Sequence, residues 1–181
     1  LGYILLTQGL MAIIVFSALI AVLYHVGVMQ RIVRAFAWVF TKLMRISGAE
    51  ALSASSNIFV GIESALTVRP HLARMTRSEF CTILTAGMAT VASNVMVVYV
   101  GALQGVFDQI AGHLVSASFL SAPAALVMSK LLVPETGAPQ TLGEHVAPHT
   151  DEEQTLFASV ITGANNGLRL VGGIAALLIA V

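Results

Sequence analysis

Long stretches without a formally charged residue constrain this chain more than any other feature of its sequence. No Asp, Glu, Lys or Arg occurs from Leu1 to Gln30, from Phe80 to Phe107, from Gln109 to Ser129 or from Gln154 to Leu168. A membrane-spanning helix needs about 20 mostly apolar residues, because the hydrocarbon core is roughly 30 Å thick. The first three stretches are long enough, and the fourth can continue beyond Arg169. The pattern therefore predicts a polytopic, all-α membrane protein.

The composition supports this class and excludes several others. Of the 181 residues, 57% are hydrophobic and 10% are charged, and the mean hydropathy is +0.88. A soluble domain carries about 25% charged residues, so a soluble globular enzyme and a disordered chain are excluded. Nine basic residues balance nine acidic ones, which leaves no cationic face for nucleic acid. The single cysteine excludes a disulfide framework and a thiolate zinc site within the chain. Because the chain opens and closes inside apolar stretches, we interpret it as part of a longer protein.

The first two segments differ in where their charges fall. Residues 1–30 are expected to form a spanning helix, and residues 31–46 an amphipathic helix that lies in the headgroup plane, since cationic and bulky apolar side chains alternate there. The cationic residues are Arg31, Arg34, Lys42 and Arg45. No acidic residue balances them, so the positive-inside rule places this side of the membrane in the cytoplasm.

Residues 47–69 are the most informative part of the sequence. The segment is long enough to span a membrane, yet it contains several serines, Asn57 and two glutamates, and basic residues flank both of its ends. If both flanks are cytoplasmic, the segment must enter and leave on the same side, as a re-entrant hairpin with two arms of about ten residues. A turn at that depth is tolerated only where it is buried in protein or lines a wet cavity. We therefore expect this turn to face a binding site.

The remaining segments continue the predicted series of helices. Thr76 followed by Glu79 predicts a capping box at the start of a spanning helix over residues 77–104. Small and polar residues from Gly87 to Asn94 interrupt this helix, either for close helix packing or as a break whose freed carbonyls bind a cation. The expected order then has a spanning helix over residues 109–132, a polar loop over 133–153, and a last spanning helix over 154–181.

Glu63 and Asn57 are the strongest functional candidates among the polar residues. A carboxylate in the middle of a membrane segment costs about 2.5–3.5 kcal/mol on insertion scales, so it usually lies in a polar pathway. Glu50, near the mouth of the hairpin, is expected to be solvated or to pair with Arg45 or Arg69.

Oxygen ligands for a cation can be supplied by the hairpin and the interrupted helix. The amide of Asn57, the hydroxyl of Thr90 and the carbonyls of Val60 and Val91 would suit a small alkali cation, since hard cations prefer oxygen. None of these groups suits zinc or a redox metal. An intramembrane hydrolase that uses a hairpin serine is a rival hypothesis, but no dedicated base stands beside a nucleophile in the sequence.

A series of motifs in the same order resembles the concentrative nucleoside transporters. The first run, from Gly48 to Tyr99, contains EALSASSNIFVGIES, then LTVRP, MTRSE and GMATVAS. A second run, from Ala117 to Thr136, reads ASFLSAPAALVMSKLLVPET, and the helix sequence GANNGLRLVGGIAALLIA is similar to the family's next helix. The resemblance covers nearly the whole chain.

This resemblance implies an architecture and an activity. The family is built from two inverted repeats, and the chain would hold the first repeat and the helix that starts the second. Members are homotrimers that carry nucleosides through the lipid bilayer with sodium or proton coupling and move the hairpin bundle against a scaffold. We therefore expect a multi-pass symporter of the bacterial inner membrane, with a sodium ion or a proton as its coupling ion.

The resemblance also implies roles for individual residues. The sodium site would be formed by Asn57, Val60, Thr90 and Val91. The nucleoside would contact Gly61, Ile62, Glu63 and Val95, with Glu63 reading the nucleobase. Members commonly show Gly-Gln-Thr-Glu at the hairpin tip, whereas this chain has the shorter Gly61-Ile62-Glu63. A transporter or gate domain of the same fold for a different small polar solute is therefore the alternative function.

Overall fold

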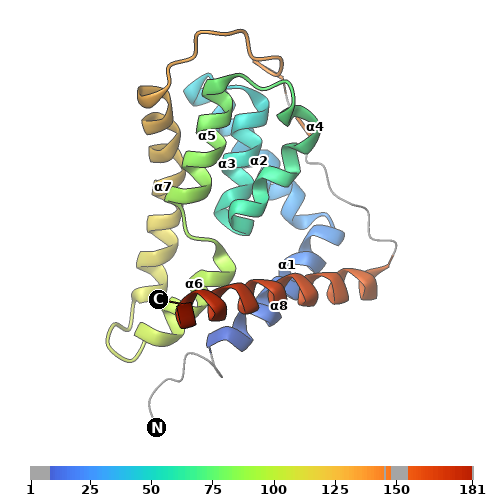
Figure 1. Ribbon diagram of the computed structural model, residues 1–181, viewed down its shortest axis with the longest axis vertical. Helices are drawn as coiled ribbons and strands as arrows, with labels where there is room; N and C mark the ends of the chain where they lie inside the picture. Colours follow the sequence, from blue (N-terminus) through green and yellow to red (C-terminus); the bar gives the residue numbers. More distant parts are fainter. Residues whose placement is uncertain (1–8, 145, 148–154, 181) are drawn as a thin grey trace. The chain divides into compact units, whose positions relative to one another are not determined.

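The described part of the chain is helical almost throughout and contains no strand (Figure 1). The computed structural model describes residues 9–144, 146–147 and 155–180, with only the backbone described at Ile62, Glu63, Leu66 and Leu178. The helices are α1 (Leu10–His25), α2 (Val28–Met44), α3 (Gly48–Val60), the 3-10 helix η2 (Gly61–Val68), α4 (Arg69–Leu72), α5 (Arg77–Ala89), α6 (Ser93–Leu103), α7 (Ile110–Leu132) and α8 (Leu156–Ala180).

Within the described residues, two helical segments are long and apolar enough to cross a membrane. They are Arg77–Leu103, which comprises α5 and α6, and Ile110–Leu132, and a third exists if α1 and α2 count as one bent span. The predicted all-α membrane class is therefore confirmed. Among the described residues, α8 is not one of these segments. Its assignment as a spanning helix stays a prediction.

The chain divides into two compact units. The first unit contains α1, α6, the start of α7 and α8, and the second contains α2, α3, η2, α4, α5 and most of α7. Parts of the predicted segments 1–30, 133–153 and 154–181 fall on residues outside the described ones.

In the first unit, α1 and α8 pack closely against each other (Figure 1). Glycines make this approach possible, since a Cβ added at Gly163 would lie 2.6 Å from the Cβ of Ala21 and 2.8 Å from the carbonyl oxygen of Ser17. One turn further along, a Cβ at Gly167 would lie 2.8 Å from the Cα of Ile14. This small-xxx-small spacing is typical of helix pairs in membranes.

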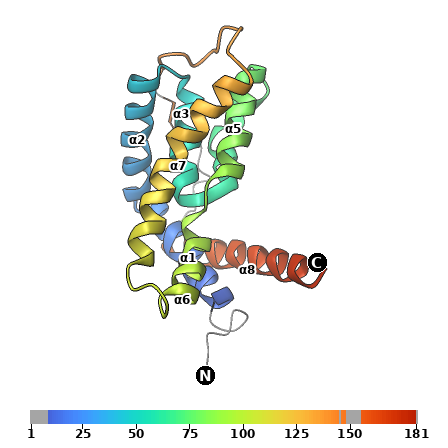
Figure 2. The same cartoon turned by 90° about the vertical axis from the view of Figure 1, so that its left-hand side faces the viewer.

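In the second unit, α2, α3, α5 and α7 run side by side around an apolar core (Figure 2). Helix α3 is buried from Gly48 to Ile58, because its Ala- and Ser-rich sequence lets its neighbours approach on all sides. Helix α2 has one buried face, formed by Val33, Ala37 and Phe40. Aromatic rings from three helices join the core beside it: Phe36, Phe40, Phe59 and Phe119.

The segment predicted as a hairpin forms α3 and η2, which packs back along α3. The chain turns at Gly61, whose φ of 81° is accessible to glycine. Helix α3 continues to Val60, so the turn lies a few residues beyond the centre of the predicted segment 47–69. The second arm is an eight-residue 3-10 helix and the short α4, instead of one α-helix of about ten residues. The re-entrant path of this hairpin stays a prediction.

Candidate cation and substrate site

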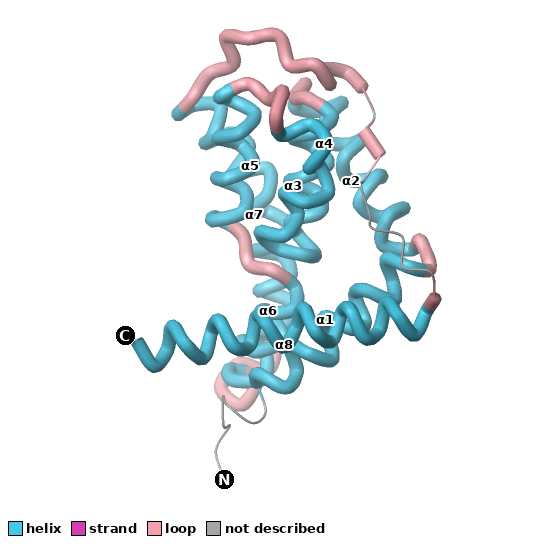
Figure 3. Tube along the Cα trace, turned by 45° about the vertical axis from the view of Figure 1, so that its right-hand side comes forward, coloured by secondary structure: helices cyan, strands magenta, loops and turns pink. Residues whose placement is uncertain are grey.

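The hairpin tip lies against the break between α5 and α6. Helix α5 ends at Ala89, and the next three residues are not helical, as the interruption in Figure 3 shows. A Cβ added at Gly61 would lie 2.7 Å from the Cβ of Ala92, so only glycine permits this approach. The hydroxyl of Ser93 donates to the carbonyl oxygen of Ile58 at 3.1 Å. The two interrupted helices therefore meet at their interruptions.

Asn57 and Thr90, predicted separately as cation ligands, are in direct contact at this point. The Asn57 side chain is 0% exposed. Its Nδ2 donates to the carbonyl oxygen of Ala86 at 2.6 Å and also to the Thr90 hydroxyl, which itself donates to Ala86 at 3.0 Å. Its Oδ1 accepts a hydrogen bond from Ser64 at 3.4 Å. The site thus gathers four uncharged polar groups in one cluster, in which Thr90 is half-buried.

The two predicted carbonyl ligands lie at the ends of interrupted helices. Val60 is the last residue of α3, and Val91 lies in the break after α5. The carbonyl oxygen of Val91 accepts a hydrogen bond from Ser118 of α7 at 3.3 Å. Carbonyls at such positions lack the regular helical partner and can turn toward another donor or a cation.

The chemistry of these groups fits an alkali cation. Ala86 and Thr90 present oxygen atoms, and the amide of Asn57 reaches both. In the present arrangement the amide nitrogen faces them and supplies the positive end of a dipole. A half-turn of the amide would bring a third oxygen to the same place, where a cation would offset the repulsion between the oxygens. Within the described residues there is no cluster of three His, Cys, Asp or Glu side chains for a metal ion.

In the described part of the chain, the structure brings two of the predicted cation ligands together, but it does not do so for the predicted substrate residues. Gly61 lies at the hairpin tip, as expected. Ile62 and Glu63 follow it in η2, but their side chains lie outside the described part. Val95 lies in α6, in the first unit, where its N–H bonds the side-chain oxygen of Asn94 at 2.9 Å. The nucleoside contacts predicted for these residues stay predictions.

The expectation for Glu50 was wrong. Its side chain is 1% exposed, and its Oε1 lies 2.5 Å from the Nζ of Lys130 in α7. Arg45 and Arg69, the expected partners, are both exposed. Glu50 is the third residue of α3, where its Oε2 accepts the N–H of Ser47 at 3.0 Å and completes a capping box. This geometry directs the carboxylate back toward α7 and away from the arginines.

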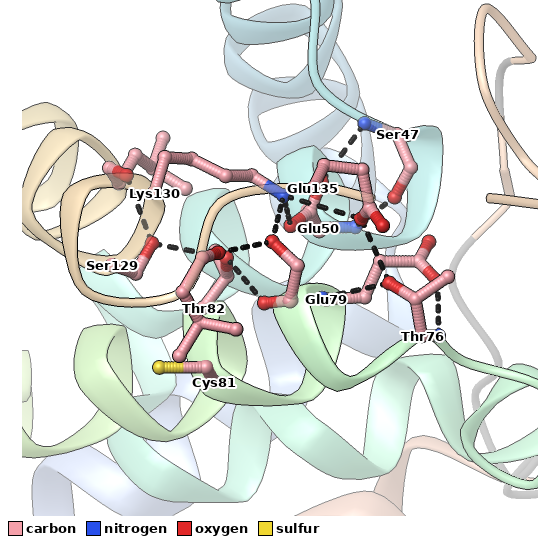
Figure 4. A network of polar contacts seen from close by, with 12 residues as sticks. Ser47, Glu50, Thr76, Glu79, Cys81, Thr82, Ser129, Lys130 and Glu135 are labelled. Atoms are coloured by element: carbon pink, nitrogen blue, oxygen red, sulfur yellow. Dashed lines mark hydrogen bonds and ion pairs between the residues drawn. The ribbon is translucent and has the colours of Figure 1, made fainter. Parts of the chain in front are cut away.

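A polar network surrounds this ion pair (Figure 4). Lys130 also donates to the hydroxyl of Ser78 at 2.9 Å, and Ser129 contacts Thr82 at 3.0 Å. The capping box predicted at Thr76 and Glu79 is present, with Glu79 2% exposed. The spacing Ser-x-x-Glu from Ser47 to Glu50 is the same signal, and it could have revealed the first capping box in the sequence.

Glu135 follows α7, outside the spanning segments, and contacts Lys130 and Thr76 of this network. Burial raises the pKa of its carboxyl, but hydrogen bonds from Thr76 at 2.7 Å and from the N–H of Gly137 at 2.9 Å, with the charge of Lys130, lower it by more. The net pKa therefore lies below its ordinary value of 4.5. A lowered pKa in the folded state means that ionised Glu135 stabilises the fold above pH 4.5, and that this contribution is lost as the pH falls through the folded-state pKa.

Comparison with known proteins matches two family descriptions along the chain. Residues 6–105 match the family Gate, described as nucleoside recognition, and residues 113–181 match the C-terminal part of Na+-dependent nucleoside transporters. The chain is 40% identical to solute carrier family 28 member 3 of Rattus norvegicus, over 93% of this chain and 23% of the relative. It is 41% identical to the uncharacterized transporter YutK of Bacillus subtilis, over 93% of this chain and 41% of the relative.

Two further similarities concern a human relative and a solved structure. The chain is 39% identical to human sodium/nucleoside cotransporter 1, over 96% of this chain and 26% of the relative. It also resembles the structure of CNTnw in an inward-facing, substrate-bound state, with a TM-score of 0.86 and 36% identity over 98% of this chain and 40% of CNTnw.

The helical spans and these matches define a multi-pass membrane protein of the transporter class, not an enzyme. More specifically, the chain belongs to the concentrative nucleoside transporter family, as its motifs predicted. It spans between 23% and 41% of the length of the curated relatives described above.

Proposed function

We propose that the protein to which this chain belongs is a cation-coupled nucleoside symporter, with a sodium ion as the coupling ion. The observation that carries the proposal is the contact of Asn57, on the hairpin, with Thr90, at the broken helix. Membership of the family supports the nucleoside as cargo. Sodium would be held by the Asn57 amide oxygen, the Thr90 hydroxyl and the carbonyls of Val60 and Val91.

Coupling follows from thermodynamic linkage between the two cargoes. The Asn57 amide contacts α5 and, through Ser64, also η2, the arm that carries Gly61, Ile62 and Glu63. A cation that turns this amide would therefore reorder the backbone that contacts the nucleoside. A nucleoside that binds the ordered tip more tightly raises the affinity for sodium by the same factor. Glu63 would accept hydrogen bonds from N–H groups of the base, and Val95 would pack against it.

The proposed arrangement in the membrane follows from the charges. Helix α2 would lie in the cytoplasmic headgroup plane of a bacterial inner membrane, because Arg31, Arg34 and Lys42 are exposed along it beside Trp38. The hairpin of α3 and η2 would enter from that same side and return. The complete protein would be a homotrimer, as the family resemblance implies.

Uptake by the full-length protein tests the cation site. In proteoliposomes, Asn57→Ala should raise the sodium concentration for half-maximal nucleoside uptake by about tenfold, as expected for about 1.4 kcal/mol of lost binding. Asn166→Ala is the matched control, since Asn166 is exposed on α8. An unchanged sodium dependence in Asn57→Ala would remove this residue from the site.

The same assay tests the cargo. Glu63→Gln should reduce nucleoside uptake severely, because the amide cannot replace both carboxylate oxygens as acceptors. A competition panel of purine and pyrimidine nucleosides, free bases and other small polar solutes separates nucleoside transport from the alternative cargo. Wild-type uptake by Glu63→Gln, or competition only by a different solute, would contradict the proposed role.

A further inference from the structure

Polar contacts tie α3 to α5 at two places, one near each end of α3. At the tip, Asn57 bonds Ala86 of α5 and Thr90, the residue that follows this helix. At the base, Lys130 of α7 bridges the two helices, because its Nζ lies 2.5 Å from Glu50 of α3 and donates to Ser78 of α5 at 2.9 Å. We call these contacts the tip tie and the base tie.

The two ties lie on matching faces of the two helices. Asn57 follows Glu50 by seven residues, which is two turns or about 10.5 Å of helix. On α5, Ser78 precedes Ala86 by eight residues, again about two turns and about 12 Å. A shift of α3 along α5 at the base is therefore transmitted by a straight helix to Asn57.

In the described part of the chain, no polar side chain in the middle of α3 forms a hydrogen bond with α5. The hydroxyls of Ser53 and Ser56 are buried and have no hydrogen-bond partner in the described part of the chain. Ser55 donates to the carbonyl of Ala51 on its own helix at 2.7 Å. Small side chains such as Ala51 and Ala54 contribute apolar contacts in this stretch. The polar restraints on the register of the helix pair therefore lie at its two ends.

Lys130 is built into the base tie by several contacts. The carboxylate of Glu135 lies 3.6 Å from its Nζ, and the adjacent Ser129 contacts Thr82 of α5 at 3.0 Å. Figure 4 shows these side chains converging between α3, α5 and α7. The ammonium group is also the counter-charge for Glu50, which is 1% exposed and closes the capping box of α3. Loss of the ammonium group would leave this buried carboxylate without a counter-charge.

We infer that Lys130 is a positioning residue for the cation site: by joining Glu50 to Ser78 it fixes the register of α3 against α5 and so holds Asn57 at Ala86 and Thr90. This inference rests on the proposed cation site at Asn57 and Thr90. Lys130 does not touch the cation or the nucleoside. It acts on the geometry of the ligands, two helical turns away.

The test is a comparison of Lys130→Met with Lys130→Arg in the full-length protein in proteoliposomes. Lys130→Met should raise the sodium concentration for half-maximal uptake by about fivefold, as expected when one restraint of hydrogen-bond strength is lost. The maximal rate per inserted protein at saturating sodium should stay within about twofold of wild type, because the ligands themselves are retained. Lys130→Arg keeps the donors and should restore the sodium dependence. Lys42→Met is the matched control, since Lys42 is exposed on α2.

A double-mutant cycle distinguishes positioning from a general loss of stability. If Lys130 acts through Asn57, adding Lys130→Met to Asn57→Ala should change the sodium dependence no further. The sodium-induced rise in the melting temperature of the purified protein should shrink in Lys130→Met as well. Should Lys130→Met fail to fold, the charge-neutral pair Glu50→Gln with Lys130→Met removes the base tie without an unpaired charge and should show the same rise.

Three outcomes would overturn the inference. The first is an unchanged sodium dependence of uptake in Lys130→Met or in the charge-neutral pair. The second is that Lys130→Met and Asn57→Ala raise the sodium concentration for half-maximal uptake by factors that multiply in the double mutant. The third is a lower maximal rate with an unchanged sodium dependence. If the proposed cation site itself is wrong, Asn57→Ala alone will show the sodium dependence of the wild type. This result distinguishes a failure of the site from a failure of the role given to Lys130.

Discussion

At Gly61 the backbone has φ 81° and ψ −150°, a conformation that is essentially restricted to glycine. The chain reverses here from α3 into η2. Because Gly61 has no side chain, the hairpin tip can approach Ala92 in the break between α5 and α6. One residue therefore satisfies a backbone requirement and a packing requirement together. This places Gly61 among the residues on which the geometry of Asn57 and Thr90 depends.

Gly61→Ala should therefore destabilise the hairpin tip. The strained backbone alone costs about 1–3 kcal/mol, and the new Cβ would lie 2.7 Å from that of Ala92. We expect a lower melting temperature of the purified full-length protein and a loss of sodium-driven uptake. Gly112→Ala is the control, because a Cβ there meets nothing within 4 Å. Equal melting temperatures for the two variants would show that the tip tolerates a side chain.

Single residues also show which parts of the site could be predicted from the sequence. Asn57 and Thr90 were predicted because an amide oxygen and a hydroxyl inside apolar segments can serve as ligands of a cation. The structure places the two side chains in contact. The partner of Glu50 was missed, because Lys130 lies eighty residues further along the chain and no local spacing connects the two. Ser93 and Ser118 were missed for the same reason, since each binds a carbonyl on a different element.

At the scale of elements, the helix pair α1 and α8 depends on two glycines one turn apart. Replacing Gly163 by leucine should separate the helices, because the first atom of the side chain already collides with Ala21 and with the backbone of Ser17 and Ala18. We expect a loss of about 1–3 kcal/mol, the range for overpacked sites, seen as a lower melting temperature in detergent.

Gly172→Leu serves as the control on the same helix. A Cβ at Gly172 meets nothing within 4 Å, so this variant should melt close to the wild-type temperature. If Gly163→Leu were as stable as Gly172→Leu, the close packing of α1 and α8 would not contribute to the stability of the full-length protein.

Element boundaries followed from the sequence where capping residues mark them. Thr76 and Glu79 locate the start of α5, and the small polar residues before Asn94 locate its break. The form of the second hairpin arm could not be predicted in this way. Its eight residues pack against α3 as a 3-10 helix, and this choice depends on tertiary contacts more than on the propensity of GIESALTV.

At the scale of the whole molecule, the path of the hairpin through the membrane is the main prediction. If α3 and η2 enter and leave by the same side, positions before and after the hairpin share one aqueous phase. Lys42 and Arg74 are exposed and suit this test, and Asp108, beyond the span Arg77–Leu103, marks the opposite phase.

Cysteine labelling of the full-length protein measures this directly. In a background that lacks other cysteines, including Cys81, a membrane-impermeant maleimide should label Lys42→Cys and Arg74→Cys only in inside-out vesicles. Asp108→Cys should react only in right-side-out vesicles. If Lys42→Cys and Arg74→Cys were labelled from opposite faces, the hairpin would cross the membrane and the proposed site would lose its location.

The sequence by itself determined that the chain is a helical membrane protein, because uncharged stretches longer than the bilayer can satisfy their backbone only within helices. It also determined which residues have the chemistry for a cation site, since side-chain type is local information. Only the tertiary structure decided which of these groups meet. The pairing of Glu50 with Lys130, the convergence of four phenylalanines and the close approach at Gly163 all join residues far apart in the chain, and these contacts are selected by three-dimensional packing that no linear spacing encodes.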